Sequence, residues 1–144
     1  MPNNFGNSIM KALINSPLHG ILGEGMAVIT VTGSITGRLI STPINVAREG
    51  EVYTAISSRE RTWWRNLRGG AVAELRTTGK TMKVRGEVIE AVEGVNETLA
   101  QYFQAHPAVV KYYKIRTDAN GGLDAGDLQR VCGERVVIRL HKNP

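Results

Sequence analysis

The sequence predicts an α+β fold built on a mostly antiparallel β-barrel of six or seven strands with flanking helices. Short runs rich in β-branched residues recur along the chain, and glycine-containing turns join several of them at hairpin spacing. Strands that follow one another through tight turns pair antiparallel, which favours a barrel over a parallel sheet. The expected strands are 26–32, 38–47, 51–57, 71–76, 81–91 and 134–141.

Helical patterns occur at the start of the chain, in its middle and before the last strand. The first is amphipathic, because its apolar residues recur at helical spacing. A later one has Asn96 at the position of a helix cap, and Pro107 suits the first turn of the next. The expected helices are 4–22, 61–67, 96–105 and a short piece from Pro107, and a loop is expected over 118–126.

Length and composition fit a single domain over residues 1–144. With 42% hydrophobic residues the chain can bury a core without covalent staples, and its one cysteine, Cys132, cannot form an internal disulfide. No signal peptide and no membrane span are expected, because basic residues do not precede the first apolar stretch and it is interrupted by Lys11, Asn15, Pro17 and His19. We therefore expect a cytoplasmic protein whose helix 4–22 packs on the barrel or extends from it, where it could contact a membrane surface.

Positive charge is concentrated in one stretch of the chain. Between Arg59 and Arg85 lie eight cations and only two acids, Glu60 and Glu74. Such a patch suits a nucleic acid, an acidic lipid surface, or a small ligand with phosphates and carboxylates. Few aromatic residues are interleaved with these charges to stack on bases, so nucleic acid is not an expected partner.

The motifs of the common catalytic classes are absent. The histidines His19, His106 and His141 are far apart in sequence, and no carboxylate accompanies them at metal-ligand spacing. Cys132 stands beside an expected strand with no neighbour to activate it. We therefore expect neither a metal site nor a catalytic side chain, and an enzyme of this sequence would depend on a cofactor.

A proline marks a special position in the second expected strand. Pro43 has no N–H to give to a β-ladder, so it predicts an edge, a bulge or a place where the sheet opens. An opening in a sheet can admit a flat ligand.

Several short motifs between residues 26 and 91 resemble those of the deazaflavin (F420)-dependent nitroreductase family. They are Thr32-Gly33, Thr36-Gly37-Arg38, a proline in the next strand, a strand that ends in serine, and Trp63-Trp64-Arg65-Asn66-Leu67. The resemblance implies a split β-barrel of the FMN-binding, pyridoxamine-phosphate-oxidase type. It also implies a groove for the coenzyme F420.

The resemblance assigns roles by position. The segment from Thr42 to Asn45 would border the deazaflavin ring, and the serines and arginine that end the third strand would contact the ribityl chain and phosphate. Tyr112 and Tyr113 would bind substrate. The implied cofactor-binding residues are Arg38, Thr42, Pro43, Ile44, Asn45, Ser57, Ser58, Arg59, Trp63 and Asn66.

One departure keeps alternatives open. Many family members have a basic pair in the first turn, where this chain has Ser34 and Ile35. FMN is therefore an alternative cofactor, and either Arg38 or the basic stretch beyond Arg59 could substitute for the missing cations. The leading expectation is an F420H2-dependent reductase that transfers a hydride to a quinone, nitroaromatic or enone. A non-catalytic flavin or deazaflavin carrier is the alternative, a basic nucleic-acid-binding barrel is the third reading, and a homodimer is compatible with each.

Overall fold

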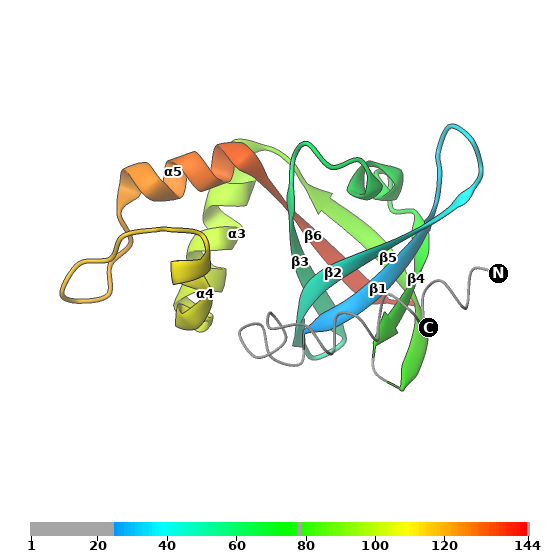
Figure 1. The fold of residues 1–144 in the computed structure, drawn as a ribbon, viewed down its shortest axis with the longest axis horizontal. Coiled ribbons are helices and arrows are strands. Elements are labelled where there is room, and N and C mark those ends of the chain that lie inside the picture. Colours follow the sequence, from blue (N-terminus) through cyan, green and yellow to red (C-terminus); the bar gives the residue numbers. More distant parts are fainter. Residues whose placement is uncertain (1–24, 78, 144) are drawn as a thin grey trace.

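Six antiparallel strands form a closed barrel in the order β1-β2-β3-β6-β5-β4 (Figure 1). The computed structural model describes residues 25–77 and 79–143. The expected helix 4–22 lies outside the described residues. The strands are β1 (Met26–Thr32), β2 (Leu39–Glu49), β3 (Val52–Ser58), β4 (Val72–Thr77), β5 (Lys80–Ile89) and β6 (Arg135–Lys142). The six-stranded antiparallel barrel predicted from the sequence is confirmed, with strand ends displaced by one or two residues.

The barrel interior is filled by alternate residues of each strand. In β1, Ala27, Ile29 and Val31 belong to the barrel core and are almost fully buried. This alternation follows from the two-residue period of a strand, which sends successive side chains to opposite faces. The short 3-10 helix η1 (Trp63–Leu67) packs its buried residues, both tryptophans and Leu67, against this core. The expected helix 61–67 therefore exists, in a shorter and tighter form.

The barrel is split between β2 and β3. Residues 39–45 of β2 pair with β1, but only residues 46–49 pair with β3. Among the described residues, the first half of β2 therefore has no strand neighbour on its β3 side, and Pro43 lies within this unpaired half. The prediction that the sheet opens at Pro43 is confirmed.

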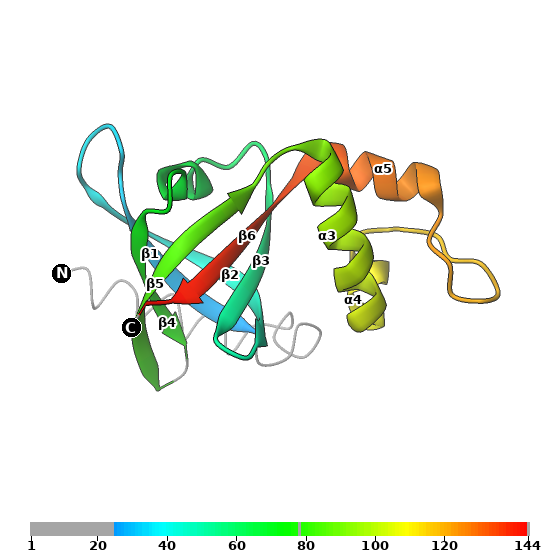
Figure 2. The ribbon, with the colours of Figure 1, turned by 180° about the vertical axis from the view of Figure 1, so that it is seen from behind.

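Three helices stand together on one side of the barrel: α3 (Val92–Ala105), α4 (Pro107–Tyr112) and α5 (Ala125–Glu134) (Figures 1 and 2). They share a second core, centred on Phe103 and Leu99, with β6 and the end of β5. The expected start of α3 at Asn96 was wrong. The helix begins at Val92 because Val95, one turn before Leu99, continues its buried stripe.

The sequence did not predict α5. Its first residues were assigned to the loop 118–126, yet Asp124 caps the helix by accepting a hydrogen bond from the Asp127 amide at 3.0 Å. Val131 and Cys132 then bury one face of the helix. The segment 118–126 is rich in glycine and aspartate, as a loop would be, but one of its aspartates, Asp124, is the N-cap of α5.

Gly86 in β5 is required by the close approach of η1. A Cβ at this position would lie 2.8 Å from the Leu67 Cβ. We expect Gly86→Ala to lower the free energy of unfolding by about 2 kcal/mol in urea denaturation, because the overpacked side chains must shift. Gly133→Ala is the control, since a Cβ there meets nothing within 4 Å. Equal stability of the two variants would contradict this packing.

Candidate functional site: a cleft beside the split barrel

A cleft of about 890 Å³ lies between the outer face of β2 and β3 and the helices α3 and α4. Pro43 and Asn45 line it from β2, and Ile56 and Ser58 line it from β3. These residues alternate with the inward-facing residues of the same strands, so the cleft follows the outer face of the barrel at its split. Ile44 and Val46 of the barrel core also reach it.

Backbone polar groups face the opening of the split. The Val46 amide donates to the Gly25 carbonyl at 2.5 Å, on the side of β1. Because backbone bonds of an antiparallel strand alternate between its two neighbours, Pro43 and Asn45 direct theirs away from β1, toward the missing partner. The missing N–H of Pro43 therefore costs no hydrogen bond in the ladder with β1. The Asn45 amide and the carbonyls of Pro43 and Asn45 face the opening.

Cations from four separate elements line the cleft. Arg48 comes from the end of β2, Arg61 from the turn before η1, Lys80 from the start of β5 and Arg135 from the start of β6. No aspartate or glutamate is among the described residues that line it. This excess of cations over acids in the described lining suits an anionic ligand.

Hydrogen bonds from the indole rings fix η1 to the end of β3. Trp63, which lines the cleft, donates from Nε1 to the Ser57 hydroxyl at 3.2 Å, and Trp64 donates to the Ser58 carbonyl at 3.1 Å. The Ser57 hydroxyl in turn donates to the Ser58 carbonyl at 3.1 Å. The Ser57 hydroxyl therefore uses its one donor within the chain and positions the indole of Trp63.

Aromatic residues of the helices form the opposite wall. Tyr102, Tyr112 and Tyr113 line the cleft, and the Arg135 guanidinium lies over the Tyr113 ring at 5.2 Å from its centroid. Burial raises the pKa of Tyr113 and, with a contribution from the Glu49 charge, that of Tyr102. Tyr102 and Tyr113 are therefore neutral, flat side chains in this wall.

Most of the residues predicted for the site do line the cleft. The structure brings together Pro43, Ile44, Asn45, Ser57, Ser58, Trp63, Tyr112 and Tyr113. Their common location results from the split, which exposes one half of β2 beside the end of β3.

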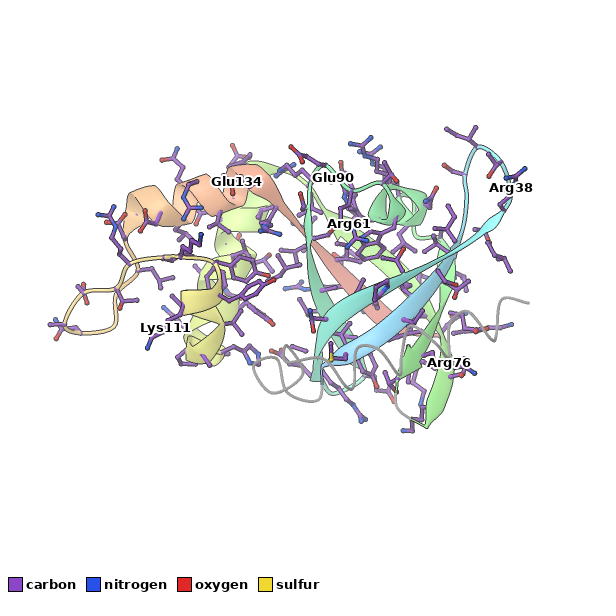
Figure 3. The ribbon with its side chains drawn as sticks, in the orientation of Figure 1. Arg38, Arg61, Arg76, Glu90, Lys111 and Glu134 are labelled. Atoms are coloured by element: carbon purple, nitrogen blue, oxygen red, sulfur yellow. The ribbon has the colours of Figure 1, made fainter. Side chains whose placement is uncertain are left out.

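Four predicted residues lie elsewhere. Thr42 is buried on the inward face of β2, and Arg38 lies on the exposed β1–β2 turn, away from Arg61 (Figure 3). Asn66 accepts a hydrogen bond from the Ser34 amide at 2.9 Å and so holds that turn against η1. None of these side chains is among the cleft-lining residues.

Arg59 is the fourth, and its geometry is that of a structural residue. Its guanidinium donates to the Glu90 carbonyl at 2.7 Å and to the Cys132 carbonyl at 3.1 Å. These bonds join the end of β3 to the segment after β5 and to α5. Arg59 is not among the cleft-lining residues, whereas Arg61, two residues later, does line the cleft.

Sequence reasoning missed several cleft residues because they come from distant elements. They are Arg48, Arg61, Lys80, Tyr102, His106 and Arg135. Arg61 and Lys80 belong to the basic stretch, which was the one available signal.

The family of F420H(2)-dependent quinone reductases matches residues 12–121. The chain belongs to this family. It is an F420H2-dependent oxidoreductase with F420 as its cofactor, as the sequence predicted. Neither a carrier nor a nucleic-acid-binding barrel is favoured by this match. No curated protein is similar enough to count as a relative.

Solved structures share the fold at low identity. A Listeria innocua protein assigned as a pyridoxamine 5′-phosphate oxidase has a TM-score of 0.55 at 12% identity, covering 88% of this chain and 91% of that one. A Bacteroides thetaiotaomicron protein assigned to 5-nitroimidazole antibiotic resistance has a TM-score of 0.53 at 12% identity, covering 95% and 80%. An FAD and heme binding protein of Mycobacterium smegmatis has a TM-score of 0.54 at 18% identity, covering 88% and 65%. These likenesses confirm the predicted split-barrel fold.

Two other features, a membrane-spanning helix and a metal site, are not found among the described residues. Within residues 25–77 and 79–143, no helix has the length and apolar character needed to cross a bilayer. The same residues hold no group of three or more His, Cys, Asp or Glu side chains arranged to hold a metal ion.

Proposed function

We propose that the protein binds F420 in the cleft, along the unpaired half of β2. The reduced cofactor would then reduce a quinone that lies against the wall formed by Tyr102, Tyr112 and Tyr113. The observation that carries the proposal is an open strand edge beside a cleft in which every arginine, lysine, aspartate or glutamate of the described lining is a cation. A flat heterocycle can hydrogen-bond to the backbone at Pro43 and Asn45, and an anionic chain can reach Arg61. The residues present therefore fit the cofactor that the family uses.

When bound, reduced F420 supplies a hydride to the acceptor. The chain's own residues bind and orient the reactants. The backbone around Asn45 fixes the edge of the ring, Trp63 closes one side of the cleft, and Tyr112 and Tyr113 cover the acceptor. The contribution of the protein is mainly to hold the two partners at short distance and in fixed orientation.

Cofactor titration tests the proposal directly. Oxidised F420 and, separately, FMN are added to the full chain, and binding is followed by fluorescence. We expect saturable binding of F420 and weaker binding of FMN. Reduced F420 is then mixed with menadione, and its oxidation is expected to be faster with protein than without. Absence of F420 binding, or equal rates with and without protein, would contradict the proposed function.

Arg61 is expected to contribute to this binding more than Arg38. Arg61→Ala should weaken F420 binding about tenfold, because one charge-assisted hydrogen bond at an exposed position is worth about 1.5 kcal/mol. Arg38→Ala is the matched control, since this exposed arginine lies outside the cleft lining. Both affinities are measured by fluorescence at two salt concentrations. A larger loss in Arg38→Ala would place the anionic chain at the β1–β2 turn instead.

Three expectations remain predictions from the sequence. They are the cytoplasmic location, a homodimer, and a membrane contact through helix 4–22. A membrane contact would suit an enzyme whose quinone acceptor is lipid-soluble. Sedimentation of the full chain with vesicles tests it.

A further inference from the structure

The reduction of a quinone needs a proton as well as a hydride. Hydride transfer adds two electrons and one hydrogen to the quinone, and the product becomes a neutral hydroquinone only when a carbonyl oxygen also gains a proton. A positioned acid that supplies this proton accelerates the reaction. The source of the proton is therefore a question that the proposed function leaves open.

Most side chains that line the cleft are poor proton donors. Arginine and lysine keep their protons at neutral pH. Burial raises the pKa of Tyr102 and Tyr113, which makes them weaker acids. The Ser57 hydroxyl is already bonded to the Ser58 carbonyl. None of the described lining residues is an aspartate, glutamate or cysteine.

His106 is the histidine among the described residues that line the cleft. Imidazole is the side chain that exchanges protons near neutral pH. His106 lies at the junction of α3 and α4, and its ring packs against that of Tyr102, with centroids 4.6 Å apart and planes tilted by 39°. This ring contact and the helix junction restrict the position of the imidazole.

The two sides of the His106 ring have different surroundings. Nε2 is shielded from solvent without a hydrogen-bond partner among the described residues, and it lies 3.8 Å from Glu49 Oε1. The side chain as a whole is 34% exposed, so the ring presents another edge to the outside. Two ionisable side chains contact His106 among the described residues, Glu49 on β2 and Tyr102 on α3. Four others line the same cleft: Arg48, Tyr53, Tyr112 and Tyr113.

We propose that His106 is the proton donor to the quinone in this cleft. An N–H bond of the imidazolium breaks as an O–H bond forms on the acceptor, whose two electrons and other hydrogen come from the reduced cofactor. The products are hydroquinone and neutral imidazole, which regains its proton from water at the exposed edge of the ring. The inference rests on the proposed quinone reductase function and adds His106 as the source of the proton that the reaction needs.

The first test compares His106→Gln with His141→Gln. His141 also lies beside a carboxylate, with Nε2 at 2.9 Å from Glu87, but it is not a cleft-lining residue. We expect kcat with menadione to fall about 100-fold in His106→Gln, the typical effect of a lost general acid, and to stay unchanged in His141→Gln. F420 binding should be the same in all three proteins.

Two further readouts separate proton donation from a merely structural role. A quinone with a more acidic hydroquinone needs less help from an acid, so the loss in His106→Gln should be smaller with a chlorinated benzoquinone than with menadione. In wild type loaded with oxidised F420, which cannot give a hydride, menadione should shift the NMR signals of the His106 ring and not those of His141.

The outcomes are distinct. Equal loss with both quinones, no loss in His106→Gln, or unshifted His106 signals would overturn the inference. Failure of the wild type to bind F420 or to reduce any quinone would instead overturn the proposed function.

Discussion

Replacing Arg59 by alanine should lower the free energy of unfolding by about 3 kcal/mol and leave F420 affinity within about twofold of wild type. The guanidinium satisfies the carbonyls of Glu90 and Cys132, and each loses its partner in the variant. A buried acceptor left without a partner costs about 1–3 kcal/mol. Urea denaturation measures the first effect and fluorescence titration of the folded protein the second.

Arg61→Ala provides the reciprocal control for Arg59→Ala. Arg61 lines the cleft and has an exposed side chain, so its loss should weaken F420 binding and leave stability nearly unchanged. The two arginines are separated by one residue and have opposite expected effects. If Arg59→Ala weakened binding more than Arg61→Ala in proteins of equal stability, the assignment of Arg59 to structure would be wrong.

This pair also shows what the sequence could not decide. Both arginines belong to the basic stretch after β3, and their residue type alone suits a phosphate equally well. The backbone after Ser58 turns so that Arg59 points toward α5, an element that the sequence did not predict. Without α5 there was no visible partner for Arg59, and the motif alone assigned it to the cofactor.

The barrel could be predicted from the sequence because the patterns that indicate its strands and turns are local. β-branched runs and glycine turns predict hairpins, and Pro43 marks a strand that lacks a neighbour. The sequence could not predict that the cations of the cleft lie together, because Arg48, Lys80 and Arg135 come from separate strands. Only closure of the barrel and docking of the helices bring them together.

The helical wall of the cleft depends on Phe103. This residue is almost fully buried, and its ring centroid lies 5.5 Å from that of Tyr113, which lines the cleft. We expect Phe103→Ala to lower the free energy of unfolding by about 4 kcal/mol, because a large cavity replaces the ring. Phe103→Leu, which keeps most of the volume, should cost less than about 1.5 kcal/mol. Urea denaturation measures both.

The milder variant connects this core to the acceptor. Because Phe103→Leu stays folded but supports the Tyr113 ring less closely, KM for menadione should rise while F420 affinity stays unchanged. That pattern would assign α3 and α4 to the acceptor and β2 to the cofactor. A rise in the dissociation constant of F420 with no change in KM for menadione would reverse the assignment. The deazaflavin ring of the cofactor would then lie against the helices.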